Sequence, residues 1–239
     1  MAESVFISNS LILLYGFIIG LKHATDADHL AAIGTIVAEK KGIMSSALIG
    51  GLWGLGHTFS LTLAGLFVLF LNFQISERAE SIFELCVGIM LLFLGLNVFR
   101  KILLSEKFHF HVHSHGEHSH AHPHIHHEQE KDLAHTHHGL NLSPRSFFIG
   151  LVHGLAGSAG LMLIVIPTIN SKLLGMLYIL VFGIGSIGGM MLMSLIISLP
   201  FTLSSNMIRL NKILQALAGT FSILLGLYII YEKGFSETL

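Results

Sequence analysis

Residues 23–29 hold two histidines and two aspartates inside an otherwise apolar stretch of the chain. Apolar residues dominate before this motif, from Leu11 to Leu21, and after it, from Leu30 to Val37. Ionisable side chains at membrane depth are costly, and by default they mark a functional site. Imidazole and carboxylate groups are also ligands for first-row transition metals. The residue types and their spacing therefore predict a metal site within the membrane, formed by His23, Asp26, Asp28 and His29.

A straight helix, at about 100° per residue, would place His23, Asp26 and His29 on one face. It would turn Asp28 away from that face. Asp28 could then reach the same ion only if the helix unwinds locally; otherwise its carboxylate would hold a ligating imidazole in place. The competing interpretation is a structural ion pair between Lys22 and Asp26, which lie four residues apart.

Two further histidines, His57 and His153, lie in separate apolar segments. A histidine within the membrane often serves only as a hydrogen-bonding group between helices. Glycines flank His57, however, and His153 aligns with His23 in the internal repeat described below, so we include both among the candidate ligands. Five residues are expected beside the ligands rather than on the ion: Lys22, Thr25, Thr58, Ser158 and Ser186.

The composition is that of an integral membrane protein. Of the 239 residues, 52% are hydrophobic and 11% are charged, whereas soluble domains carry about 25% charged residues. The net charge of −1 at pH 7 gives no electrostatic basis for binding nucleic acid. The single cysteine, Cys86, excludes an internal disulfide and a thiolate cluster. We expect no cleaved signal peptide, because the first ten residues contain neither Lys nor Arg.

Six segments are apolar and long enough to cross a bilayer, which takes about 20 residues. The first two are the longest, which indicates a steep tilt, an extension beyond the bilayer or a break. The distribution of Lys and Arg predicts that both termini lie outside, since nine of these residues would then be cytoplasmic and three external. The predicted spans are residues 8–37, 43–73, 80–104, 144–168, 172–200 and 210–231.

The two halves of the chain repeat each other weakly. Residues 17–23 match residues 147–153 at an offset of 130, and matches at offsets of 129 and 131 follow in the next two segments. Each half has three spans, an odd number, so the halves must have opposite topology, which is typical of transporters. We therefore predict an all-α polytopic membrane protein with six transmembrane helices in two inverted three-helix repeats, residues 1–104 and 144–239, joined by residues 105–143.

Thirteen of the seventeen histidines lie in the segment 105–143. This segment is polar, repetitive and almost without apolar residues, so we predict a disordered cytoplasmic loop. Its His-x-His spacing suits borderline dications, and its composition predicts auxiliary metal binding. That binding should weaken in acid, because the pKa of an imidazole is about 6.5. The candidate ligands of the loop are His109, His111, His113, His115, His118, His120, His122, His124, His126, His127, His135, His137 and His138.

The motif from His23 to His29 resembles the first signature of the nickel/cobalt transporter family, in which a histidine is followed after four residues by Asp-His. The run Leu55-Gly56-His57-Thr58 resembles the second motif of that family. The short chain and the run from Trp53 to Thr58 are most similar to the urease-linked nickel permease branch. The resemblance covers the whole membrane part. It implies that the metal is selected by His23, Asp26, Asp28, His29 and His57.

These observations predict a secondary transporter for Ni²⁺, with Co²⁺ as a second cargo, in the cell (inner) membrane. Import is favoured by the first motif. We expect no enzymatic activity and no cofactor beyond the transported ion, and the chain has no nucleotide-binding motif. The expected partners are a divalent transition-metal ion and the lipid bilayer, with a cytoplasmic metallochaperone as a candidate. The oligomeric state stays open.

Several alternatives stay open at this point. Larger members of the family have eight spans, and a long His-rich loop is more typical of the efflux branch, which makes nickel/cobalt or zinc efflux the nearest alternative. The affinity order of divalent metals alone excludes neither Zn²⁺ nor Cu²⁺. From other classes, we retain a membrane redox protein with a bis-His haem at His23, His57 or His153, and a membrane metal-dependent enzyme.

Overall fold

The structure is a computed structural model that describes residues 2–38, 42–71, 76–104, 109–115, 118–124, 144–156 and 171–236. Its membrane part is helical throughout, which confirms the all-α prediction for that part. The helices are α1 (Ala2–His23), α2 (Ala27–Val37), α3 (Ile43–Leu71), α4 (Glu77–Leu104), α5 (Pro144–Gly154), α7 (Lys172–Leu203) and α8 (Ile208–Tyr231), followed by the short π-helix η2 (Glu232–Ser236).

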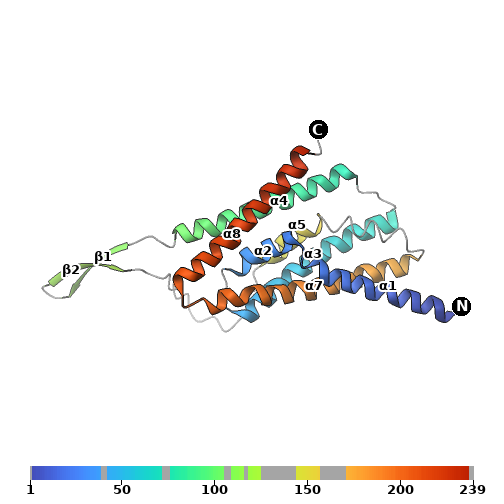
Figure 1. Cartoon of the computed structure of the whole chain (residues 1–239), viewed down its shortest axis with the longest axis horizontal. Helices are drawn as coiled ribbons and strands as arrows, with labels where there is room; N and C mark the ends of the chain where they lie inside the picture. The colour runs from blue at the N-terminus through green and yellow to red at the C-terminus, as the bar shows by residue number, and fades with distance from the viewer. Residues whose placement is uncertain are drawn as a thin grey trace.

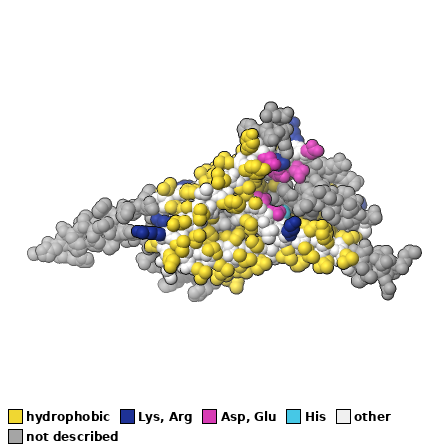
Figure 2. All heavy atoms as spheres, viewed as in Figure 1, with side chains coloured by type: hydrophobic (Ala, Val, Ile, Leu, Met, Phe, Trp, Pro, Cys, Tyr) yellow, Lys and Arg dark blue, Asp and Glu magenta, His cyan; other side chains and the backbone are white. Residues whose placement is uncertain are grey.

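Among the residues that the structure describes, four helices are long and apolar enough to cross a membrane. They are α3, α4, α7 and the helix that runs from Ile208 to Gly234. Each covers a predicted span with bounds that differ by a few residues, so these four predictions are confirmed. Large apolar side chains cover much of the surface visible in Figure 2. Phe93, Leu203 and Leu224 are each more than 60% exposed, and hydrocarbon rather than water is the medium that suits such a surface.

The first predicted span, residues 8–37, is broken rather than steeply tilted. α1 ends at His23, α2 begins at Ala27, and both flanking helices are apolar. The Thr25 and Asp26 amides donate to the carbonyls of Lys22 and His23, at 2.8 and 3.1 Å, which closes α1 with a tight turn. Thr and Asp side chains compete for backbone hydrogen bonds and favour helix ends, and Asp26 takes the extended N-cap conformation before α2.

The fourth predicted span, residues 144–168, is described only in part. Its first portion forms α5, which ends at Gly154. Residues 157–170, which include the candidate Ser158, lie outside the described residues.

The two short helices α2 and α5 lie between two pairs of long helices (Figure 1). One pair is α3 and α7, and the other is α4 and α8; α1 packs along α7, and α5 packs along α3. α2 contacts helices of both pairs. The side chains of Ala31, Ala32, Ile33 and Val37 on α2 are buried in the main apolar core. A helix too short to cross the bilayer thus forms the centre of the molecule.

Glycine allows the long helices to approach each other closely. A Cβ at Gly150 of α5 would collide with the carbonyl oxygen of Trp53 on α3, and a Cβ at Gly20 of α1 would collide with that of Phe182 on α7. Small residues are the usual means by which membrane helices reach such contact. These two contacts fix α1 and α5 against the helices that they pack along.

In the His-rich loop, for which the sequence predicts no regular structure, the structure describes two short strands. β1 (His109–His115) and β2 (His118–His124) pair antiparallel and project away from the helices (Figure 1). The alternation of histidine with other residues has the period of a strand, which accounts for this local difference. Residues 125–143 lie outside the described residues.

The close contact between Gly150 and Trp53 predicts that one added methyl group at Gly150 lowers the stability of the protein. Gly150→Ala places a Cβ against the rigid backbone of α3, so α5 and α3 must separate, and we expect a loss of about 1–3 kcal/mol of stability. The matched control is Gly188→Ala on α7, where a Cβ would have nothing within 4 Å. Thermal unfolding of the detergent-solubilised protein should be lowered for Gly150→Ala only; equal midpoints for the two variants would contradict the packing described here.

Candidate metal centre

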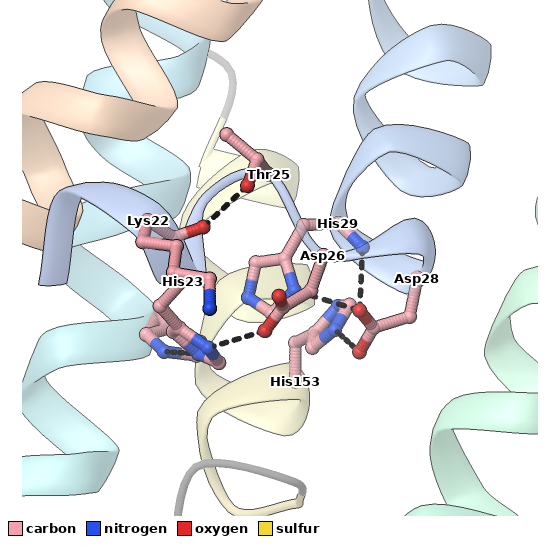
Figure 3. A network of polar contacts seen from close by, with 8 residues as sticks. Lys22, His23, Thr25, Asp26, Asp28, His29 and His153 are labelled. Atoms are coloured by element: carbon pink, nitrogen blue, oxygen red, sulfur yellow. Dashed lines mark hydrogen bonds and ion pairs between the residues drawn. The ribbon is translucent and has the colours of Figure 1, made fainter. Parts of the chain in front are cut away.

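The break between α1 and α2 brings four histidines together from different parts of the chain; Figure 3 labels His23, His29 and His153 among them. His23 is the last residue of α1, His29 lies in the first turn of α2, His57 in the middle of α3, and His153 near the end of α5. None of the four is more than 4% exposed. The six residues predicted as ligands, which also include Asp26 and Asp28, are thereby assembled around one place.

The imidazole rings lie close to one another. The ring centroids are 4.4 Å apart for His23 and His29, 4.2 Å for His29 and His153, and 5.1 Å for His23 and His57. The Nε2 atoms of His23 and His57 are 3.2 Å apart. One ring nitrogen from each of His23, His29 and His57 lies within 4.8 Å of the others. Three buried imidazoles that converge in this way match the ligand type and number of a transition-metal site.

Two carboxylates contact the Nδ1 atoms of two of these imidazoles. An oxygen of Asp26 lies 2.8 Å from His23 Nδ1, and an oxygen of Asp28 lies 2.9 Å from His29 Nδ1. A carboxylate only accepts hydrogen bonds, so each Nδ1 must carry the proton. In the neutral ring the lone pair is then on Nε2, which is the form in which histidine binds a metal.

Asp28 uses both of its oxygens. Besides His29 Nδ1, the first oxygen accepts from the His29 backbone amide at 2.9 Å, and the second lies 2.8 Å from His153 Nε2. Figure 3 shows this carboxylate between His29 and His153. One ligand atom from each of Asp28, His29 and His153 also lies within 4.8 Å of the others. His29 therefore belongs to two candidate ligand sets.

Several buried nitrogens at this centre have no hydrogen-bond partner among the described residues: His29 Nε2, His57 Nδ1, His153 Nδ1 and Trp53 Nε1. Leaving such atoms unpaired is costly, and each one needs an explanation. A cation bound between the rings would use the free lone pair of His29 Nε2. His57 could offer the lone pair of its Nε2 atom after a change of tautomer.

The carboxylates form the accessible side of the centre. The side chain of Asp26 is 46% exposed and that of Asp28 is 26% exposed, whereas the histidines behind them are buried. In Figure 2, acidic side chains and a histidine reach the surface in the middle of the visible face, between stretches of hydrophobic surface. Negative charge at the opening favours the approach of a dication.

Because the helix breaks between His23 and Ala27, the motif residues are arranged differently from the straight-helix prediction. His57 joins His23 and His29, while Asp26 contacts the far nitrogen of His23 instead of completing the set. Asp28 reaches the centre through the unwound turn, as the sequence allows. Lys22 is exposed, and no ion pair with Asp26 occurs in the part of the chain that the structure describes. The competing interpretation as a simple Lys22–Asp26 pair thus has no support in this geometry.

The residues expected beside the ligands have different roles. The Thr25 hydroxyl donates to the Lys22 carbonyl at 2.6 Å, which stabilises the end of α1 (Figure 3). The Thr58 hydroxyl donates to the Gly183 carbonyl at 3.3 Å, which links α3 to α7. Ser186 is fully buried, and its hydroxyl has no partner among the described side chains. Neither threonine touches an imidazole through these bonds.

Trp53 is a member of the centre that sequence reasoning missed. It is 1% exposed, and its ring centroid lies 5.2 Å from that of His29 and 5.4 Å from that of His153. Tryptophan in membrane proteins is usually found at the interface with water. A tryptophan in mid-span, one helical turn before a histidine on the same face, was the available signal.

Comparison with known proteins identifies the family. No protein-family model and no solved structure matches the chain. The chain is 35% identical over 74 residues to the high-affinity nickel transport protein of Cupriavidus necator, which is 30% of this chain and 20% of that protein. It is 36% identical over 228 residues to the urease accessory protein UreH of Bacillus sp. strain TB-90, which is 95% of this chain and 94% of that protein. The chain therefore belongs to the family of UreH, the nickel permease-like branch of the nickel/cobalt transporters.

Proposed function

We propose that this membrane protein transports Ni²⁺, with Co²⁺ as a second cargo, and that it works as an importer. The observation that carries the proposal is the convergence of buried histidines from α1, α2, α3 and α5 at a helix break inside the membrane. The names of the relatives support the same metal, since one is a nickel transport protein and the other serves urease. They also favour a transporter over an enzyme.

In this proposal His23, His29 and His57 bind the ion, and Asp26 orients His23. Imidazole nitrogen suits Ni²⁺ and Co²⁺, and the carboxylate partners raise the basicity of the rings that they hold. Asp28 and His153 form the second set with His29. An ion that passes from one set to the other would exchange its remaining ligands while His29 stays bound.

The two halves, residues 1–104 and 144–239, are proposed to be inverted repeats that rock against each other. The close contacts described above support this division. Gly20 of α1 lies against Phe182 of α7, and Gly150 of α5 lies against Trp53 of α3. In the sequence repeat, Gly150 corresponds to Gly20 at an offset of 130, and Phe182 corresponds to Trp53 at an offset of 129. Such exchanged contacts are expected of two related halves around a shared axis. The Lys and Arg distribution favours external termini and a cytoplasmic loop.

The geometry weakens the haem alternative. For each pair of these histidines whose ring contact the structure gives, the two ring centroids are no more than 6.1 Å apart. A porphyrin between two axial imidazoles would have to occupy space that the other imidazoles and the Trp53 ring fill. Zinc and efflux are retained as alternatives, because the ligand types do not separate Zn²⁺ from Ni²⁺ and the geometry carries no direction.

A transport measurement tests the proposal. Cells that express the protein should accumulate radiolabelled nickel above a vector control, and His23→Ala should reduce the excess at least about tenfold because it removes a ligand. The control is Phe93→Ala, which truncates an exposed ring of α4 and should retain uptake. Accumulation below the vector control, restored by His23→Ala, would make the protein an exporter. No change in nickel content with either form would remove nickel as the cargo.

A binding measurement tests the role of Asp28. Trp53 is the only tryptophan, so its fluorescence reports on the centre, and bound paramagnetic Ni²⁺ should quench it. Asp28→Asn loses the charge that holds His29 and His153, and we expect the Ni²⁺ concentration at half-quenching to rise about 10- to 100-fold. Glu77→Gln, an exposed carboxylate at the start of α4, is the control and should not shift it. Equal titrations for the two variants would show that Asp28 does not position the ligands.

A further inference from the structure

One row of side chains on α7 carries hydroxyl groups through the interior of the membrane part. Its members follow one another at every fourth residue and therefore share one ridge of the helix. This α7 row consists of Ser186, Met190, Ser194 and Ser198, and each of the four is 0% exposed. The row begins beside the metal centre, because the ring centroid of Phe182, one turn before Ser186, lies 5.7 Å from that of His23.

From the centre, the α7 row follows α3 toward the beginning of that helix. A Cβ at Gly54 would lie 3.3 Å from the sulfur of Met190, and a Cβ at Gly50 would collide with the hydroxyl of Ser194. The row thus leads to the end of the membrane part where α3 begins and α7 ends, which is the end from which the hairpin projects (Figure 1). The contact with Gly50 shows that α3 and α7 are closed against each other along this row.

Two hydroxyls of the α7 row are unpaired. Ser186 and Ser194 have no hydrogen-bond partner for their hydroxyls among the described residues. Serine in a helix usually bonds to a carbonyl about one turn back, and Ser198 does so with the Leu195 carbonyl at 2.9 Å. A buried hydroxyl without a partner costs stability and needs an explanation. We take these two hydroxyls as groups that meet water or a ligand when α3 and α7 separate.

The sequence repeat does not impose the hydroxyls. At the offset of 129, the α7 row corresponds to His57, Leu61, Gly65 and Leu69 of α3, so the positions after the histidine carry no hydroxyl. Leu61 and Leu69 belong to a separate apolar cluster between α3 and α7. This cluster follows His57 along α3, whereas Gly50 precedes it. The interface of the two helices is therefore apolar on one side of the metal centre and carries hydroxyls on the other.

We propose that the α7 row lines the route by which a hydrated divalent cation passes between the metal centre and the end of the membrane part at which α7 ends. The proposal rests on the transport function proposed above. Hydroxyl oxygens accept hydrogen bonds from the water molecules that a dication carries, and the thioether sulfur of Met190 is itself a metal ligand. Because α3 and α7 belong to different halves, the proposed rocking would part them here and admit water to the row.

Removal of the Ser194 hydroxyl tests the proposal, because a structural role and a role in the route predict different results. Ser194→Ala removes a buried hydroxyl that has no partner, so the midpoint of thermal unfolding should stay the same or rise. The initial rate of radiolabelled nickel uptake should fall about fivefold, as expected for the loss of one hydrogen bond to the passing ion. An unaltered uptake rate would overturn the proposal.

The matched control is Ser222→Ala on α8. The Ser222 side chain is also fully buried, but its hydroxyl donates to the Leu91 carbonyl of α4 at 2.8 Å. Its removal should lower the unfolding midpoint and leave the uptake rate per folded protein unchanged. A fall in the midpoint of Ser194→Ala as large as that of the control would show that the Ser194 hydroxyl is structural, which would also overturn the proposal.

Cysteine labelling tests the row without a measurement of transport. In a Cys86→Ala background, which removes the single native thiol, Ser194→Cys should react with a water-soluble methanethiosulfonate, since the reaction needs a thiolate and therefore water. Leu192→Cys, at a position that is 50% exposed on the apolar outer surface of α7, should react at least about tenfold more slowly. Ser198→Cys repeats the test one turn further along the row.

The labelling separates a failure of the route from a failure of the transport function. Reaction at both row positions as slow as that of Leu192→Cys would overturn the route. Reaction at the row in a protein that does not accumulate nickel would keep the route as a passage for water and a cation, and would reject only the proposed cargo.

Discussion

The need to pair the backbone polar groups that a helix break exposes inside hydrocarbon governs the centre of this protein. Breaking a membrane helix frees backbone groups, and here the turn at residues 24–26 pairs them locally: the Lys22 carbonyl accepts from both the amide and the hydroxyl of Thr25. The carboxylates of Asp26 and Asp28 are paired with imidazoles in the same turn. The groups that make the break tolerable are therefore the groups that shape the candidate metal centre.

The far end of α2 is held by the same principle. The Ala38 carbonyl, which follows α2, accepts from the Gln215 side chain of α8 at 3.3 Å. Gln215 in turn donates to Asn211 at 2.6 Å, and Asn211 donates to the Phe201 carbonyl near the end of α7 at 3.0 Å. These bonds link α2 to both pairs of long helices. Asp28 and His29 thus sit on a short helix that is anchored at its opposite end, which limits how they can move relative to His57 and His153.

Local sequence patterns predict much of this arrangement, but not the contacts between distant residues. Apolar length locates the four long helices, and the cost of buried charge identifies His23, Asp28 and His29. Thr25 and Asp26 before an apolar run were a usable helix-start signal for the break. By contrast, the contacts of Asp28 with His153 and of His23 with His57 arise from helix packing that no local pattern encodes.

The two proposed ligand sets share His29. This sharing addresses a problem that every transporter has, which is to bind its cargo and then release it. In the set of His23, His29 and His57, carboxylates already fix the tautomers of the His23 and His29 rings. In the other set both Asp28 oxygens are engaged, with His29 and with His153. These hydrogen bonds draw charge from the Asp28 oxygens that an ion would bind, so we propose that this set holds the ion less tightly. We propose that an ion passes from one set to the other by an exchange of side-chain contacts around His29, and that the rocking of the two halves then releases it.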